Sequence, residues 1–402
     1  MVNSDQQASH NTPVVDFSNT EIAFSHKSDN GLKRTFWLFR LMNKAWLVSA
    51  GGSFGLWMNS TGISLFDPLI RSTIFRQFCG GISLEDSTEA IQHLAELNTL
   101  TVLDFGAEGK VKESDFDYVL KENLRAIAYA ADNPSVPVIS SKITALASNA
   151  ILEKYQLGKL NSDAEKEAFK RVEERLDTLC HAAREAGVAV FIDAEETWMQ
   201  DTIDYLVLKL MERYNKENVV VYHTYQIYRK DKLESLKADH RLAREKGFIL
   251  GAKIVRGAYM EKERARAKER GYPSPIQDTK EDTDRDFDAA IAYCVDHYEE
   301  IASCNASHNM KSNLIQAEMI AARGLPRDHR HLNFCQLYGM SDYITFNLAA
   351  EGYNVAKYLP YGPVKEVLPY LIRRARENTA VTGEMSRELG LIVSEMKRRG
   401  LK

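Results

Sequence analysis

The chain has 402 residues, of which 44% are hydrophobic and 27% are charged, and its formal net charge is -4 at pH 7. This composition is typical of a soluble globular protein that buries a sizeable core. Lys and Arg are scattered among acidic residues, which excludes the one-sided basic surface that nucleic-acid binding requires. Barrels of alternating strands and helices commonly run past about 250 residues as a single domain, so we expect one large domain with terminal additions.

The cysteines and the apolar segments indicate a reduced, cytoplasmic setting. No C-x-x-C pair occurs among the five cysteines, so we expect mostly buried thiols at Cys79, Cys180, Cys294, Cys304 and Cys335. The first forty residues lack a secretory signal, and the apolar stretch over residues 46–58 is shorter than the roughly 20 residues that span a bilayer. We therefore expect a cytoplasmic protein that does not cross a membrane.

Two segments precede the repeating part of the chain. Residues 1–30 are polar and show no periodicity, which predicts a loosely held arm. Over residues 31–95 apolar residues begin to recur at helical spacing, with Phe36, Phe39 and Met42 as the first examples. This spacing predicts a helical region ahead of the main domain.

Eight short runs rich in Val, Ile, Leu and aromatic residues lie between residues 96 and 380, and most precede an amphipathic helical pattern. Regular alternation of strand and helix predicts a parallel sheet, and eight units close a (β/α)8 TIM-type barrel. Gly187 and Gly247 suit the ends of two intervening helices. Residues 381–402 are assigned to a C-terminal helix. The predicted strands cover residues 100–105, 136–141, 188–192, 219–225, 248–255, 301–307, 331–335 and 355–359.

Polar residues at the carboxyl ends of these strands are the candidates for a site, because active sites of such barrels lie there. Lys142 follows the second strand, where the alternative is a solvated loop charge. The third strand leads to Asp193, Glu195 and Glu196, of which Asp193 lies nearest the strand and the other two could equally cap the next helix. The fourth leads to Gln226, whose amide both donates and accepts hydrogen bonds.

The fifth strand ends in GAKIVRGAYM. Lys253, Val255 and Gly257 share one face by the two-residue period of a strand, whereas Arg256 points the other way. Gly257 permits a ligand to approach the backbone closely. The sixth and seventh strands contribute further polar residues, which are Ser307, His308 and Asn309 from the sixth and Gln336, expected to be exposed at the mouth, from the seventh.

A metal site and a nucleotide-binding loop are the alternatives at this end of the barrel. His308 could join His329, His331 or Cys335 as a zinc ligand, but the two other histidines fall before or at the start of the seventh strand, at the opposite end. Neither a P-loop nor a strand-turn-helix G-x-G-x-x-G motif occurs. We therefore expect no metal, and any nucleotide must be held in another way.

A helix that begins at Pro363 after the eighth strand carries Arg373, Arg374 and Glu377. At helical spacing Glu377 can pair with either arginine. Two adjacent guanidiniums match a carboxylate, which makes them a natural clamp for an amino acid, and a solvated basic helix face is the alternative.

Taken together, these segments resemble the proline dehydrogenase family over residues 73–396. The resemblance rests on IDAEE, TYQIYRKD, GAKIVRGAYMEKERARAKERGY, ASHN, QLYGM and YLPYGPVKEVLPYLIRRARENT in this order. It is greatest to the stand-alone and mitochondrial-type enzymes. It implies a distorted (β/α)8 barrel with FAD over the carboxyl ends of the strands and a final helix across the barrel mouth.

The resemblance also implies roles for individual residues. Arg373 and Arg374 would clamp the substrate carboxylate with help from Lys142, and Asp193 would brace that clamp. Lys253 would lie near flavin N5, where other members often have arginine. Tyr259 and Tyr358 would form aromatic walls of the proline pocket. The residues expected to bind FAD are Ala194, Gln226, Val255, Arg256, Gly257, Ala258, Ser307, His308, Asn309, Gln336 and Glu377.

The implied reaction is oxidation of L-proline to Δ1-pyrroline-5-carboxylate, with hydride transfer from C5 to FAD and electron transfer to a quinone. Pyrroline-5-carboxylate dehydrogenase is then expected to be a separate protein. Peripheral contact with the inner face of the membrane would follow from a lipid-soluble acceptor. One alternative is 4-hydroxyproline dehydrogenase, against which the ring of Tyr358 argues because it fills the space beside proline C4. The other is a non-catalytic binding relative, which would have no need for these polar strand-end residues.

Overall fold

Eight parallel strands form a closed barrel in chain order, and β8 pairs with β1 to complete it. The computed structural model describes residues 14–42, 71–106, 111–380 and 384–402, with side chains except at 71–72, 373–380 and 384–385. All eight predicted strands are confirmed, with ends that differ from the predicted ones by at most two residues. They are β1 Leu100–Phe105, β2 Val138–Lys142, β3 Ala189–Asp193, β4 Val221–Gln226, β5 Leu250–Val255, β6 Ile301–Ala306, β7 Leu332–Leu337 and β8 Val355–Tyr361.

The two faces of each strand pack differently. Residues such as Ile192 and Ile254 face outward and are buried under the helices, while Phe191, Cys304 and Tyr358 fill the barrel interior. This alternation follows from the two-residue period of a strand. Side chains at the carboxyl end of the interior face therefore point to one mouth of the barrel.

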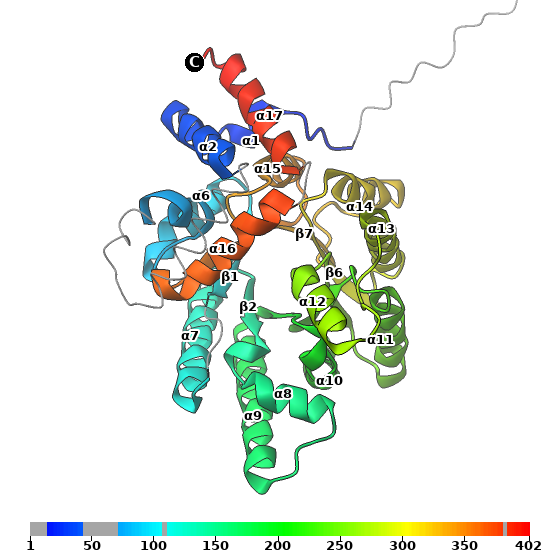
Figure 1. Ribbon diagram of the computed structural model, residues 1–402. Helices are drawn as coiled ribbons and strands as arrows, with labels where there is room; N and C mark the ends of the chain where they lie inside the picture. Colours follow the sequence, from blue (N-terminus) through cyan, green and yellow to red (C-terminus); the bar gives the residue numbers. More distant parts are fainter. Residues whose placement is uncertain (1–13, 43–70, 107–110, 381–383) are drawn as a thin grey trace, which may run out of the picture.

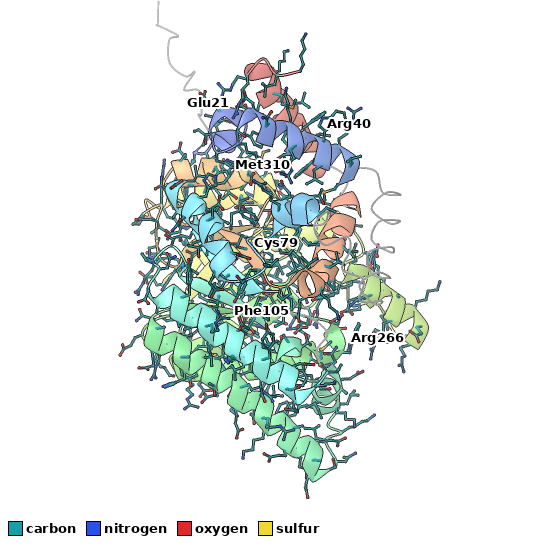
Figure 2. The ribbon with its side chains drawn as sticks, turned by 90° about the vertical axis from the view of Figure 1, so that its left-hand side faces the viewer. Glu21, Arg40, Cys79, Phe105, Arg266 and Met310 are labelled. Carbon is teal, nitrogen blue, oxygen red and sulfur yellow. The ribbon has the colours of Figure 1, made fainter. Side chains whose placement is uncertain are left out.

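Helices follow the strands and surround the barrel (Figure 1). α7 and α9 run side by side along its outside (Figure 2). Ser162 and Glu165 form a capping box at the start of α9, and Gly187 and Gly247 end α9 and α11 with positive φ angles of 67° and 64°. The barrel helices are α7 Glu113–Ala131, α8 Asn149–Gln156, α9 Asp163–Ala186, α10 Thr197–Tyr214, α11 Lys232–Lys246, α12 Met260–Arg270, α13 Lys280–Asp296, α14 Met310–Ala322, α15 Asp342–Ala350 and α16 Val364–Ala380, with a 3-10 turn, η3, at Ile143–Ala145.

The N-terminal segment differs from the loose arm expected over residues 1–30. From residue 14 onward it is packed, with Phe17 and Phe24 buried, and α1 Thr20–Phe24 contacts α15 and the C-terminal helix α17 Glu384–Arg398. Burial of these aromatic side chains offsets the entropy cost of ordering an otherwise polar segment. Residues 1–13 lie outside the described residues.

The helical region expected over residues 31–95 is present where the structure describes it. The elements are α2 Asp29–Met42, a π-helical turn η1 Arg71–Phe75, α5 Arg76–Phe78, a 3-10 turn η2 Glu85–Ser87 and α6 Thr88–Glu96. The apolar stretch over residues 46–58 lies outside the described residues. No helix in the described part of the chain has both the length and the apolarity to cross a bilayer.

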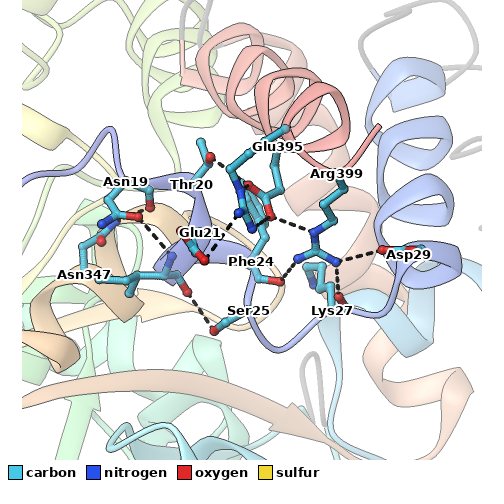
Figure 3. A network of polar contacts seen from close by, with 12 residues as sticks. Asn19, Thr20, Glu21, Phe24, Ser25, Lys27, Asp29, Asn347, Glu395 and Arg399 are labelled. Atoms are coloured by element: carbon cyan, nitrogen blue, oxygen red, sulfur yellow. Dashed lines mark hydrogen bonds and ion pairs between the residues drawn. The ribbon is translucent and has the colours of Figure 1, made fainter. Parts of the chain in front are cut away.

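The segment over residues 20–29 and the C-terminal helix α17 meet on the outside of the barrel. Arg399 donates hydrogen bonds to the carbonyl oxygens of Phe24 and Lys27, at 2.8 and 2.7 Å, and pairs with Asp29 at 3.2 Å (Figure 3). Glu395, fully buried on α17, accepts from the Thr20 hydroxyl at 2.9 Å. The guanidinium of Arg399, three residues before the last one, is thus bound by groups of the protein itself.

The five cysteines are buried and form no disulfide, as the sequence predicts. Burial raises the pKa of the Cys294 thiol to about 12, which keeps it protonated. These thiols therefore belong to the packed interior.

Candidate active site

A cavity of about 280 Å³ opens at the carboxyl ends of the strands. Every predicted site residue whose side chain is described lines this cavity, while the roles given to these residues stay predictions. The lining consists of Lys142, Asp193, Ala194, Thr224, Gln226, Lys253, Val255, Arg256, Gly257, Ala258, Tyr259, Lys280, Ala306, Ser307, His308, Asn309, Cys335, Gln336, Leu337, Tyr358 and Tyr370.

A larger cavity of about 830 Å³ lies at the opposite end, where residues such as Leu100, Val138 and Val355 begin their strands. It contains none of the predicted site residues. Because the βα loops that carry catalytic groups gather at the carboxyl ends of barrel strands, we assign the candidate site to the smaller cavity.

Asp193 is the centre of the polar cluster in this cavity. Its carboxylate accepts hydrogen bonds from the ammonium of Lys253, from the hydroxyl of Tyr358 at 3.0 Å and from the hydroxyl of Ser140 at 3.1 Å. The Lys142 ammonium lies 3.6 Å from the same carboxylate and 3.9 Å from Asp104. Residues from β1, β2, β3, β5 and β8 therefore converge on one point.

The charges of this cluster keep Asp193 ionised. Burial alone would raise the pKa of Asp193, but the positive charges of Lys253 and Lys142 outweigh it and hold that pKa well below its usual range. The Lys253 ammonium also lies over the rings of Phe191 and Tyr358, at 5.2 and 5.4 Å from their centroids. These rings favour a buried cation by their electron-rich faces.

Glu195 lies directly behind the cavity wall. The Gln226 side-chain amide donates to the backbone oxygen of Glu195 at 2.7 Å, and the Glu195 carboxylate accepts from the Thr144 backbone N–H at 3.0 Å and from the Thr144 hydroxyl. Burial raises the pKa of Glu195 to about 7. Neither Glu195 nor Glu196 caps α10 with its side chain, because Glu195 is bound to Thr144 and Glu196 pairs with Lys262 at 2.8 Å.

The residues after β5 form a second part of the wall. Lys253, Val255 and Gly257 face the cavity together as predicted. Arg256 also lines the cavity, although we expected it to point away, because β5 ends at Val255 and its alternation stops there. Its guanidinium binds Asp284 and the Ser307 hydroxyl, both at 2.7 Å.

Residues after β6 and β7 complete the wall. His308 Nδ1 lies 2.9 Å from the Ser341 hydroxyl. Asn309 caps α14 by accepting from the Ser312 backbone N–H at 3.1 Å. Gln336 is almost fully buried, in contrast to the exposure expected for it, because its amide donates to the Ser307 carbonyl oxygen at 3.1 Å and accepts from the Thr345 hydroxyl at 2.9 Å.

The two arginines expected to clamp the substrate belong to α16, which crosses the carboxyl end of the barrel (Figure 1). The side chains of Arg373, Arg374 and Glu377 lie outside the described residues. Tyr370, which precedes Arg373 by three positions, is buried and lines the cavity. Residues three apart share a helix face, so this face of α16 is the one nearest the cavity.

Tyr370, Thr224 and Lys280 line the cavity but were missed in the sequence. The two-residue period that links Gln226 to Thr224 could have found the threonine, and the helical spacing from Arg373 could have found Tyr370. Lys280 lies at the start of α13, far from any strand end, and no sequence signal marks it. In the described part of the chain, no three His, Cys, Asp or Glu side chains are grouped to hold a metal ion.

The family model for proline dehydrogenase matches residues 87–387, three quarters of the chain. The chain belongs to the proline dehydrogenase family. The family is one of flavoenzymes, and the matched residues include all eight strands and α16. The family assignment rests on this match and on relatives that are more than 30% identical over more than four fifths of the chain.

Three relatives illustrate the range of proteins to which this proline dehydrogenase family member is similar. Mitochondrial proline dehydrogenase 1 of Caenorhabditis elegans is 33% identical over 84% of this chain and 53% of its own length. The carbapenem antibiotics biosynthesis protein CarD of Pectobacterium carotovorum is 34% identical over 82% of this chain and 85% of its own length. A hydroxyproline dehydrogenase of Xenopus laevis is 31% identical over 84% of this chain and 80% of its own length.

The solved structures support the fold. Proline utilization A from Bdellovibrio bacteriovorus, inactivated by N-propargylglycine, superposes with a TM-score of 0.71 at 20% identity, over 90% of this chain and 38% of that one. The chain spans 53% of the nematode relative and 36% of mitochondrial proline dehydrogenase 1 of Drosophila melanogaster. Family membership and the barrel are thus shown. The choice between proline and hydroxyproline as substrate depends on the residues of the site.

Proposed function

We propose that this protein oxidises L-proline at C5 with FAD, giving Δ1-pyrroline-5-carboxylate, and passes the electrons to a quinone. The observation that carries the proposal is the cluster of Asp193, Lys253, Lys142 and Tyr358 in the cavity at the carboxyl end of the barrel. Family membership supplies the class of reaction.

The residues around the cavity fit a flavin. Flavin ring edges require hydrogen-bond donors, and the wall provides buried cationic and neutral donors in Lys253, Gln226 and Ser307. Lys253 has three N–H groups, of which the contact with Asp193 uses one. Bound FAD would supply the hydride acceptor of the reaction. Arg256, Gly257, Ala258, His308 and the backbone around Asn309 would hold its remaining parts.

The chain's own residues would bind and orient the substrate. Arg373 and Arg374 are proposed to bind the carboxylate of proline, with Lys142 as the third positive charge. Fixing the carboxylate sets the position of C5. Hydride transfer from C5 depends on this orientation and does not require a nucleophile. Tyr358, Tyr259 and Tyr370 are all more than nine-tenths buried around the cavity and would exclude water from the ring.

Asp193 is proposed to act by position and charge. Loss of hydride from C5 leaves positive charge on the substrate ring, and an ionised carboxylate in the same cavity favours that charge. Asp193 also orients Lys253 and Tyr358 through the hydrogen bonds described above. The Asp193 carboxylate thereby connects Tyr358, which is proposed to contact the substrate, with Lys253, which is proposed to contact the flavin.

4-Hydroxyproline is the second candidate substrate, because the relative from Xenopus laevis bears that name. The environment of Tyr358 favours proline. Its hydroxyl donates a hydrogen bond of 3.0 Å to Asp193 and lies 3.0 Å from the hydroxyl of Ser140, so the ring cannot move aside easily for an added hydroxyl. A buried ionised cluster of this kind costs desolvation free energy. A catalytic role gives a reason to keep such a cluster, and a non-catalytic role does not.

The surroundings of the reaction are part of the proposal. A lipid-soluble quinone requires access to a membrane, so we place the enzyme in the cytoplasm with peripheral contact at the inner face of the membrane. The product would pass to a pyrroline-5-carboxylate dehydrogenase carried by a separate protein.

The decisive experiment is a visible spectrum of the purified full chain before and after substrate is added without oxygen. We expect a flavin spectrum that bleaches with L-proline, recovers on addition of a soluble quinone, and responds poorly to 4-hydroxyproline. A preparation that cannot be loaded with FAD would refute the proposal. Faster bleaching with 4-hydroxyproline than with proline would replace the substrate and keep the chemistry.

A further inference from the structure

Two side chains that line the cavity form polar contacts with residues at the start of α15. His308 Nδ1 lies 2.9 Å from the Ser341 hydroxyl, and Gln336 accepts a hydrogen bond of 2.9 Å from the Thr345 hydroxyl. Ser341 is the N-cap of α15, and its backbone oxygen accepts a hydrogen bond from the backbone N–H of Thr345 at 3.1 Å. The position of this turn therefore determines where two proposed flavin-binding residues lie.

The turn adopts an unfavourable backbone conformation. Ser341 has φ 52° and ψ 41°, the left-handed region that residues other than glycine seldom occupy. Such a conformation persists only where the surrounding structure holds it. The side chain of Ser341 does not cap its own helix, so another group has to satisfy the first N–H groups of α15.

That group is Glu388 of the C-terminal helix α17. Its carboxylate accepts from the backbone N–H of Ser341 at 3.0 Å and from that of Asp342 at 3.4 Å. Glu388 is only 5% exposed. A carboxylate at a helix N-terminus is favoured by the helix dipole and by the unpaired N–H groups there.

Charges on neighbouring segments complete the arrangement. Asp342 pairs with Lys357 of β8 at 2.9 Å and with Lys27 at 3.3 Å, and His26 lies 3.4 Å from it. The two lysines offset the carboxylates of Asp342 and Glu388 in a buried setting. The first turn of α15 is thus held by the N-terminal segment, by β8 and by α17 together.

We infer that Glu388 is a positioning residue for the flavin site, acting from the C-terminal helix through Ser341 on His308. The inference rests on the proposed function, because it takes His308 to contact the flavin. Glu388 is not among the residues that line the cavity, so its effect should fall on FAD binding and leave the binding of proline unchanged.

Two variants test the connection from opposite ends. Glu388→Gln replaces one acceptor oxygen by an amide donor, so only one of the two backbone N–H groups can be satisfied. Ser341→Gly removes the hydroxyl that contacts His308, while glycine suits the positive φ of this position and should not destabilise the fold. The matched control is Glu395→Gln on the same helix, because the carboxylate of Glu395 binds Thr20, Arg398 and Arg399, none of which belongs to α15.

The measurements are the dissociation constant of FAD for each full-length apoprotein, the flavin absorption band, and KM for L-proline. We expect Glu388→Gln and Ser341→Gly each to raise the FAD dissociation constant at least fivefold and to shift the absorption band. KM for proline should stay within twofold, and Glu395→Gln should bind FAD like the wild type. The FAD dissociation constant of the double variant should not exceed that of the single variant that binds FAD less tightly.

Wild-type FAD affinity in Ser341→Gly would overturn the inference even if Glu388→Gln failed to fold. Equal loss of FAD from Glu395→Gln would also overturn it, because α17 as a whole and not Glu388 would then be responsible. A wild-type protein that binds no FAD would instead refute the proposed function, so the two failures are distinguishable.

Discussion

The Tyr358 hydroxyl donates a hydrogen bond of 3.0 Å to Asp193 across the barrel, between residues 165 positions apart in the chain. The carboxylate that receives it also binds the Lys253 ammonium. A wall of the proposed substrate pocket and the cation proposed for the flavin therefore depend on one acid. Effects of changing any member of this group should be strongly non-additive with effects of changing the others.

Asp193→Asn should lower kcat for proline at least tenfold. The variant keeps the shape of the side chain but leaves the buried Lys253 ammonium without its carboxylate partner and Lys142 with Asp104 at 3.9 Å, which should also cost about 3 kcal/mol of unfolding free energy. Steady-state kinetics and chemical denaturation measure the two effects. Asp177→Asn is the matched control, because Asp177 also binds a tyrosine and a cation, Tyr214 and Arg213, but far from the cavity. Normal turnover in Asp193→Asn would contradict the central role of this acid.

Arg373→Met and Arg374→Met should each lower kcat/KM for proline at least tenfold while FAD stays bound. A charge-assisted hydrogen bond to the substrate carboxylate contributes about 1.5–3 kcal/mol, which corresponds to this factor or more. Arg323→Met serves as the control, since Arg323 pairs with Asp296 on the outside of the barrel. Unchanged kinetics in both α16 variants would remove the clamp assignment.

Tyr358→Ser should raise kcat/KM for 4-hydroxyproline relative to proline. The smaller side chain opens space beside C4 and offers a hydroxyl, while turnover of proline falls because the packing and the hydrogen bond to Asp193 are lost. Tyr358→Phe separates these causes, since it keeps the ring and removes only the hydroxyl. If the ratio of the two efficiencies does not move in Tyr358→Ser, another residue such as Tyr259 closes the pocket.

Gly257→Ala should prevent stable FAD binding and lower the unfolding free energy by more than about 1 kcal/mol. The residue has φ 136°, and a Cβ atom would lie 2.4 Å from the ring of Tyr228. Thermal denaturation and flavin content give the readout. Gly390→Ala on α17 is the control, because a Cβ there meets nothing within 4 Å and alanine should stabilise the helix. Two variants of equal stability would argue against a strained backbone at Gly257.

Glu195→Gln should change how stability depends on pH. Burial raises the pKa of the Glu195 carboxyl to about 7, so the folded state holds a proton that the unfolded state releases near pH 4.3. The contribution of this group to stability is present below about pH 4.3 and is lost as pH rises to about 7. The unfolding free energy of the glutamine variant minus that of the wild type should therefore increase between these values and then level off. A difference that stays flat from pH 4 to pH 8 would show that Glu195 titrates normally.

The strands and the ends of the strands could be predicted from the sequence because both depend on local patterns. A short run of Val, Ile, Leu and aromatic residues identifies a strand wherever it lies, and eight such runs separated by helices leave a closed parallel barrel as the simplest arrangement. The same pattern places Lys142, Asp193, Gln226 and Lys253 at the carboxyl ends of their strands. All four line the cavity.

The partners of these residues were decided by the tertiary structure. Closure of the barrel brings Tyr358 to Asp193, and docking of α17 brings Glu388 to the first turn of α15; no spacing in the sequence indicates either contact. Packing against α15 and α17 likewise orders the segment from residue 14, and contacts with Ser307 and Thr345 bury Gln336. Local periodicity specifies which face of an element a side chain occupies, whereas its partner across the fold depends on strand stagger and helix docking, which arise only when distant segments pack together.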